Sequence, residues 1–172
     1  MKLNIKEATI FAMLGALMYA SKVIMDILPN IHLIGVFIVA ITVVYRKKAL
    51  YPIYIFVLLT GLLNGFATWW IPYLYIWTIL WCVVMIIPVN PHKAYAPFVY
   101  MLMCGMHGMM FGILYAPAQA LLFNMNFEAT LSWIAAGLPM DLIHGISNFI
   151  CGLLIVPIIN ALKLCQRLSG NK

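Results

Sequence analysis

The chain has 172 residues, of which 66% are hydrophobic and only 8% are charged, and its formal net charge is +6. A soluble domain carries about 25% charged residues, so this composition excludes an ordinary water-soluble globular protein. A helix crosses a bilayer with about 20 largely apolar residues. Six such helices with short loops would use almost the whole chain and leave no room for a soluble domain. We therefore expect one all-α polytopic membrane domain, over residues 1–172, as a compact bundle of six transmembrane helices in a lipid bilayer.

The apolar segments, taken in chain order, predict helices over residues 5–28, 32–45, 49–66, 70–89, 94–123 and 131–164. The first segment stops at Pro29-Asn30, and the second, which is short, stops at the basic triplet 46–48. The last two segments are longer than a bilayer requires. Pro117, Pro139 and Pro157 can kink or interrupt them.

The basic residues are distributed unevenly between the two ends of these helices. Nine of the ten lysines and arginines lie at the start of the first helix or before it, between the second and third, between the fourth and fifth, or at the end of the sixth or after it. The three opposite connections, 29–30, 67–69 and 124–130, contain none. Because lysine and arginine favour cytoplasmic loops, this pattern predicts that both termini are cytoplasmic. The positive charge is thus an orientation signal and does not indicate nucleic-acid binding.

Small residues recur at every fourth position of the first helix, at Ala8, Ala12, Ala16 and Ala20. Such a stripe lets another helix backbone approach closely in a membrane. Two interpretations stay open: packing within the bundle, or docking against a separate membrane protein.

Charged and polar side chains inside membrane helices are costly and need a reason. Lys22 and Asp26 are spaced to pair with each other near the outer end of the first helix. Asp141, His144 and Asn148 follow i, i+3, i+7 and therefore share one face of the sixth helix. That face should point into the bundle, either as a structural network reaching Lys22 or as the polar floor of a ligand site.

Aromatic residues form a second stripe, in the fourth helix. The outer residues 69–73 are typical of an interfacial belt. Trp77 and Trp81 lie deeper, where indole rings suit stacking on a flat ligand, although lipid-facing packing is an equal alternative. Tyr115 and Gln119, at the outer end of the fifth helix, are candidates for hydrogen bonds to the same ligand.

Metal or enzymatic chemistry has little support. The Met-, Cys- and His-containing run 103–110 offers soft ligands of the kind that copper(I) prefers, but methionine is also an ordinary apolar filler. The four cysteines show no C-x-x-C pairing, and the chain has no nucleophile–base pair or phosphate-binding loop. We expect no metal site, no cofactor and no catalysis.

With its six apolar segments, the alanine stripe and the sequence Pro29-Asn30-Ile31-His32-Leu33 after the first helix, the chain resembles the substrate-binding S component of energy-coupling factor (ECF) transporters, a type of ABC transporter. These proteins import vitamins and other micronutrients across the plasma membrane of prokaryotes. The resemblance covers nearly the whole chain.

The resemblance implies that the alanine face of the first helix docks on a transmembrane coupling protein, which two ATPase subunits drive. ATP is hydrolysed by those partners only. The ligand would be captured from outside, in a pocket built by the outer ends of helices four to six and closed by the segment after the first helix. The substrate-binding residues would then be Lys22, Trp77, Trp81, Tyr115, Gln119, Asp141, His144 and Asn148. They suit a small vitamin- or nucleobase-like heterocycle.

Metal-transporting relatives begin with a Met-His pair, whereas this chain begins Met1-Lys2, which argues against nickel or cobalt uptake. Two other functions remain possible from the sequence. A small membrane scaffold or assembly protein would show the same helices, and a stand-alone proton-coupled carrier would use Asp141 and His144 as a proton relay.

Overall fold

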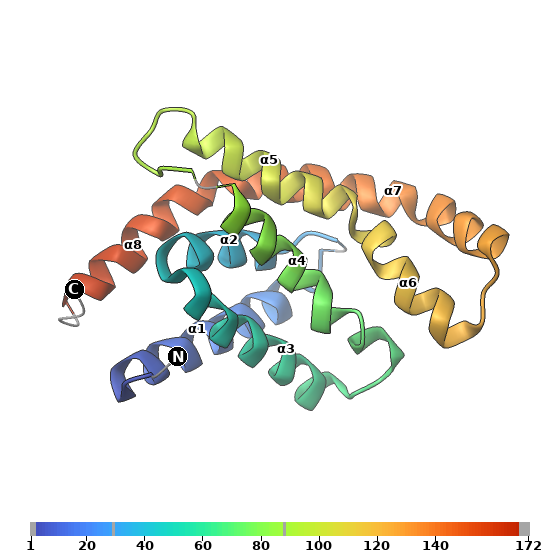
Figure 1. Cartoon of the computed structure of the whole chain (residues 1–172), viewed down its shortest axis with the longest axis horizontal. Helices are drawn as coiled ribbons and strands as arrows, with labels where there is room; N and C mark the ends of the chain where they lie inside the picture. Colours follow the sequence, from blue (N-terminus) through green and yellow to red (C-terminus); the bar gives the residue numbers. More distant parts are fainter. Residues whose placement is uncertain (1–2, 29, 88, 169–172) are drawn as a thin grey trace.

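A computed structural model describes residues 3–28, 30–87 and 89–168, and in these ranges the chain is helical and has no strand (Figure 1). This confirms the all-α prediction. The helices, in chain order, are α1 (Ile5–Met25), α2 (Ile34–Tyr45), η1 (Arg46–Ala49), α3 (Leu50–Asn64), η2 (Thr68–Trp70), α4 (Tyr73–Ile86), α5 (Ala96–Met109), α6 (Phe111–Phe123), α7 (Phe127–Cys151), η3 (Gly152–Leu154) and α8 (Ile155–Leu168).

Four helical stretches of the described chain are long and apolar enough to cross a membrane: Ile5–Met25, Thr68–Ile86, Ala96–Phe123 and Phe127–Leu168. The prediction of a membrane protein with transmembrane helices is compatible with these four. The predicted second and third spans correspond to α2 and α3, which have only 12 and 15 residues. Neither reaches the roughly 20 residues that a lipid-exposed span requires.

The two longest predicted helices are each divided. The segment predicted over 94–123 breaks at Met110 into α5 and α6, and the segment predicted over 131–164 is interrupted by η3. Pro117 and Pro139 lie inside α6 and α7, whereas Pro157 lies in the first turn of α8, directly after η3. Only the last of these prolines therefore marks a break.

Other boundaries shift by a few residues. The last predicted helix starts earlier, at Phe127, because the side chain of Asn126 accepts a hydrogen bond from the Ala129 amide and caps α7. The first ends at Met25 and not at residue 28. Pro29, which we took as its stop signal, lies outside the described residues, as do the terminal residues 1–2 and 169–172.

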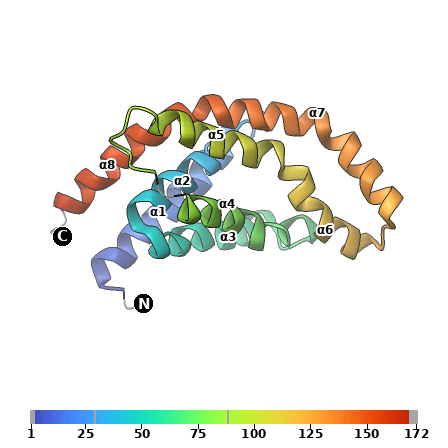
Figure 2. The same cartoon turned by 45° about the horizontal axis from the view of Figure 1, so that its top comes forward.

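The helices pack closely where glycines face a neighbour. A Cβ on Gly108 of α5 would lie 2.8 Å from the backbone oxygen of His144 in α7. A Cβ on Gly15 of α1 would lie 2.5 Å from the Ile55 side chain of α3. Helix α2 runs through the centre, and all its residues from Ile34 to Thr42 are buried. Figure 2 shows the α5–α7 pair as a layer above α1 to α4.

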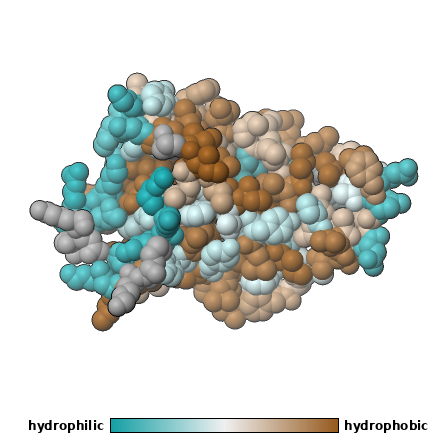
Figure 3. Space-filling model, viewed as in Figure 1, coloured by the Kyte–Doolittle hydropathy of each residue, from teal (hydrophilic) through white to brown (hydrophobic). Residues whose placement is uncertain are grey.

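The basic segments gather at one end of the molecule. Lys48 of η1 forms an ion pair with Glu7 in the first turn of α1. The guanidinium of Arg46 donates to the backbone oxygen of Met85 near the end of α4, at 3.3 Å. Figures 1 and 2 place the first turn of α1 and the last turn of α8 at this end, on the left. Figure 3 shows many hydrophilic residues at this end and a smaller group at the opposite end, with a broad hydrophobic surface between them.

Gly15→Leu is expected to destabilise the protein, because the new side chain has no space against Ile55 and the backbone oxygen of Pro52. Overpacking of this kind costs about 1–3 kcal/mol of unfolding free energy. The thermal unfolding midpoint in detergent measures the loss. Met13→Leu, on the exposed side of α1, is the control and should leave the midpoint unchanged. Equal midpoints for the two variants would contradict the α1–α3 packing described here.

Candidate functional site

The polar face of α7 points into the protein, as its spacing predicts. Asp141, His144 and Asn148 expose only 7%, 3% and 1% of their surfaces, while their neighbours Leu142, Ile143 and Ile146 are about half exposed. Polar groups are expensive to bury unless they are paired, so this face needs partners inside the bundle.

His144 of this face belongs to a group of five aromatic rings that contact one another. We call this group the ring cluster, and its members are His32, Trp77, His107, Phe111 and His144. The centroids of His32 and His144 lie 4.6 Å apart, and those of Phe111 and His144 lie 4.9 Å apart. Trp77 lies 5.8 Å from both His107 and Phe111. The cluster therefore unites the α1–α2 connection with α4, α5, α6 and α7.

Several polar atoms of this region are buried without a hydrogen-bond partner among the described residues. They are Nδ1 of His32, Nε1 of Trp77, Nδ1 of His107, Nε2 of His144, and both side-chain atoms of Asn148. A buried donor or acceptor left unpaired costs about 1–3 kcal/mol. Buried polar atoms without a protein partner are rare in folded proteins, so this group of them indicates a place where a further polar partner can bind.

The connection between α1 and α2 is fastened to α7 beside the cluster. The Ser147 hydroxyl lies 3.0 Å from the backbone oxygen of Asn30 and 3.0 Å from that of His144, and it is positioned to donate to either. Two residues after Asn30, His32 packs edge-on to His144. Burial lowers the pKa of the His32 imidazole to about 4, so this ring is uncharged at neutral pH.

Asp141 has a structural partner. Its Oδ1 and Oδ2 both accept from the backbone amide of Gly112, each at 3.1 Å. Gly112 is the second residue of α6, where amides lack partners within the helix, and Met110 at the cap position supplies no side-chain bond. Asp141 thus caps α6 from α7. A Cβ on Gly112 would collide with this carboxylate, which explains the glycine.

Asp141→Ala is expected to lower the unfolding free energy of the ligand-free protein by about 1–2 kcal/mol, the usual cost of losing a helix cap. Asp141→Asn should retain most of it, because the amide oxygen still accepts from Gly112. Thermal unfolding in detergent measures both. Asp26→Asn, which breaks the exposed pair with Lys22, is the control and should cost well under 1 kcal/mol. If the Asp141→Ala protein is as stable as the parent, Asp141 does not stabilise α6 as a cap.

The remaining predicted site residues lie around or away from the ring cluster. Lys22 pairs with Asp26 at 3.0 Å, as its spacing predicted, and does not reach Asp141. Tyr115 packs near Phe111, stacks on Trp133, and donates to the backbone oxygen of Trp69 at 3.1 Å. Gln119, one turn further along α6, is half-buried.

Trp81 lies at the basic end, where its indole nitrogen donates to the backbone oxygen of Arg46 at 3.1 Å. The helical stripe that joined Trp77 and Trp81 in the sequence is therefore divided: Trp77 belongs to the ring cluster, and Trp81 ties α4 to η1. A ligand contact for Trp81 remains a prediction.

Sequence reasoning missed His32, His107 and Phe111 as cluster members. The imidazole Nε2–H of His107 donates to the backbone oxygen of Ile76 at 3.1 Å, which joins α5 to α4. The available signal was the scarcity of polar residues: the chain has four histidines, and three of them meet here. In the described chain, no three His, Cys, Asp or Glu side chains lie close enough together to hold a metal ion.

The alanine stripe of α1 faces outward. Ala8, Ala12, Ala16 and Ala20 are all exposed, whereas Phe11, Leu14, Gly15 and Met18 are the buried residues of the helix. Ala16 and Ala20 also line a groove of about 550 Å³ between α1 and α8, together with Tyr45, Leu162 and Cys165. The stripe therefore does not pack within the bundle.

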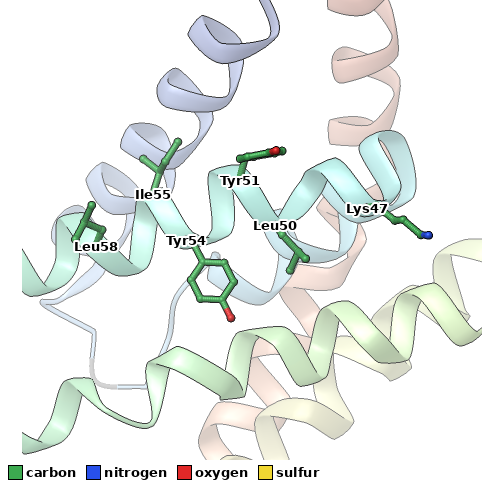
Figure 4. A pocket seen from close by; sticks show the side chains of 6 residues that line it. All are labelled: Lys47, Leu50, Tyr51, Tyr54, Ile55 and Leu58. Carbon is green, nitrogen blue, oxygen red and sulfur yellow. The ribbon is translucent and has the colours of Figure 1, made fainter. Parts of the chain in front are cut away.

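A different groove runs along α3, as Figure 4 shows, with a volume of about 490 Å³. It is lined by Lys47, Leu50, Tyr51, Tyr54, Ile55 and Leu58. Tyr54 points toward α4, where its hydroxyl donates to the backbone oxygen of Leu74. None of the predicted ligand-binding residues lines this groove.

No family model matches the chain, and neither does any curated protein or solved structure. The case for a function therefore comes from the residues of this chain and their geometry.

Proposed function

We propose that the protein is the substrate-specific, membrane-embedded binding subunit of an ECF-type micronutrient importer. It captures a small vitamin- or nucleobase-like heterocycle from outside at the ring cluster and delivers it inward when it is docked on a coupling protein driven by two ATPases. The observation that carries the proposal is the buried ring cluster with its unpaired polar atoms. A membrane scaffold has no use for such a cluster, because each unpaired group costs folding free energy.

The exposed alanine stripe supports the second half of the proposal. Lipid gives no hydrophobic drive for helix association, so helices that meet in a membrane use small residues for close backbone contact. In this protein, the alanine stripe of α1 is exposed, and the buried residues of α1 lie on its other face. Its natural occupant is a helix of the coupling protein. The ATPases supply the energy, and this chain hydrolyses nothing and needs no cofactor of its own.

We further propose six membrane crossings with both termini on the cytoplasmic side of a prokaryotic plasma membrane. The contacts of Lys48 with Glu7 and of Arg46 with Met85 support this, because they bring separate basic segments to one end. Positive charge marks the cytoplasmic side. Helix α2 crosses inside the bundle, where protein and not lipid surrounds its backbone, and so a length below that of a lipid-exposed span is tolerated.

The test is to purify the chain in detergent, identify small molecules that leave with it by mass spectrometry, and measure their uptake in cells. Uptake should require the coupling protein and should stop when the partner ATPases carry an inactivating substitution. Uptake that continues without ATPases would instead establish the stand-alone carrier. Absence of any ligand, together with retained partner assembly, would favour the scaffold.

A further inference from the structure

The ring cluster contains no lysine, arginine, aspartate or glutamate side chain. Its polar members are three imidazoles and one indole, and the Asn148 carboxamide lies one turn along α7 from His144. Lys22, the basic residue of α1 that precedes the cluster, is neutralised by Asp26. None of the other lysines and arginines in the described ranges belongs to a segment that contributes a ring to the cluster, and Lys6 lies in the first turn of α1. Both charges of the Lys22–Asp26 pair act on the His32 ring. Asp141 adds a carboxylate near the cluster, because its partner Gly112 follows Phe111 directly.

This charge pattern disfavours anions. A phosphate or carboxylate bound in a low-dielectric site needs a guanidinium, an ammonium or several backbone amides. Here the amide of Gly112 is already used by Asp141 and is not available to an anion.

The hydrogen-bond capacity of the cluster is also specific. Trp77 Nε1 can only donate. The His107 ring donates through Nε2 to Ile76, so its Nδ1 accepts when the ring is neutral. These two rings lie 5.8 Å apart and are tilted by 35°. The Asn148 carboxamide adds an unpaired donor and an unpaired acceptor side by side.

We propose that the site takes a planar heteroaromatic compound that has no anionic group and that carries a hydrogen-bond acceptor next to a donor on its edge, as in a ring lactam, amide or amidine. This inference rests on the proposed function for the location of the site. Phosphorylated and carboxylated forms of the same compounds are excluded. The hydrogen-bond acceptor of the ligand pairs with Trp77, and its donor pairs with His107. The carboxamide of Asn148 bonds to a second donor and acceptor on the edge of the ligand.

The experiment uses the full chain in detergent and a panel of matched pairs. Each pair is an uncharged lactam or amide heterocycle and its carboxylate or phosphate form: hypoxanthine, inosine and inosine 5′-monophosphate; nicotinamide and nicotinate; pterin and pterin-6-carboxylate. Calorimetry and quenching of tryptophan fluorescence measure binding. We expect at least one uncharged member to bind and its anionic form to bind at least about 100-fold more weakly. Tighter binding of any anionic form, or no binding by every uncharged member, overturns the proposal.

Variants assign the contact. Asn148→Leu should weaken binding of the best panel member at least about 10-fold, because two hydrogen bonds are lost. Asn160→Leu, at an exposed position of α8, is the matched control and should bind like the parent. If Asn148→Leu does not fold, Asn148→Asp replaces it, since it keeps the shape but removes the donor and adds a negative charge. Parental affinity in the folded variant overturns the role of Asn148.

The two levels of proposal fail differently. An anionic ligand that is taken up only with the ATPases would leave the importer function standing and remove the charge rule. An uncharged ligand that binds but is taken up without ATPases would support the preference for uncharged ligands and contradict the importer function.

Discussion

Replacing Ala12 and Ala16 together with leucine is expected to abolish association with the coupling protein. Both alanines are exposed, and they lie one helical turn apart on the face that we assign to docking. Two leucines would hold a partner backbone several ångströms away, so the close contact on which membrane helices depend is lost. Co-purification through a tag on the coupling protein should fall at least about 100-fold, which corresponds to roughly 2.7 kcal/mol.

Ligand affinity and thermal stability of the isolated double variant should match those of the parent, because both alanines are exposed and Ala16 only lines the open groove between α1 and α8. Leu17→Met, at a half-exposed neighbouring position, controls for a general effect of changing this helix. Recovery of the full complex with the double variant would remove the docking role of the stripe.

The second large effect is expected at Trp77, which is 1% exposed and contacts five other rings: His32, Phe56, Tyr73, His107 and Phe111. Trp77→Ala should cost about 3–5 kcal/mol of unfolding free energy, the usual cost of removing a buried tryptophan. It should also eliminate ligand binding. Trp77→Phe keeps an aromatic ring but loses the unpaired N–H, so it should fold and bind about 10-fold more weakly.

Trp70→Phe provides the comparison for Trp77→Phe. Its indole donates to the backbone oxygen of Val57 and is not a member of the ring cluster. Loss of that bond should lower stability slightly and leave ligand affinity unchanged. The same affinity for Trp77→Phe and the parent would show that the indole N–H does not meet the ligand.

The helical spacing of polar residues and the spacing of opposite charges predict part of this architecture, because both are local properties of the sequence. The 141–144–148 face was placed correctly inside the bundle, since three polar residues in an apolar helix have one favourable direction. The pair Lys22–Asp26 followed from the i,i+4 rule. The break at Met110 was not predicted, because Asp141 caps α6 through a contact between distant segments. The interruption at Gly152–Leu154 lies just before Pro157, a residue that was expected to kink or interrupt this helix.

The cluster itself was only half predictable. Helical periodicity relates residues within one helix, so it linked Trp77 to Trp81, although contacts between helices separate them. His32 and His107 come from a connection and from a methionine-rich helix, and no spacing rule relates either of them to α7. Whether the alanine stripe faces inward or outward also depends on tertiary packing, here on the contact of Gly15 with Ile55.

The hydrogen bond from Ser147 to the backbone of Asn30 fastens the chain that leaves α1 to the helix carrying His144. If the cluster binds a ligand and α1 binds a partner, as we propose, the two binding sites are connected by this short segment and its hydrogen bond. Thermodynamic reciprocity applies to any two binding events joined in this way. If a bound ligand changes the affinity of α1 for its partner by some factor, the partner must change ligand affinity by the same factor. A partner that binds the empty protein more tightly is then also the agent that expels the ligand.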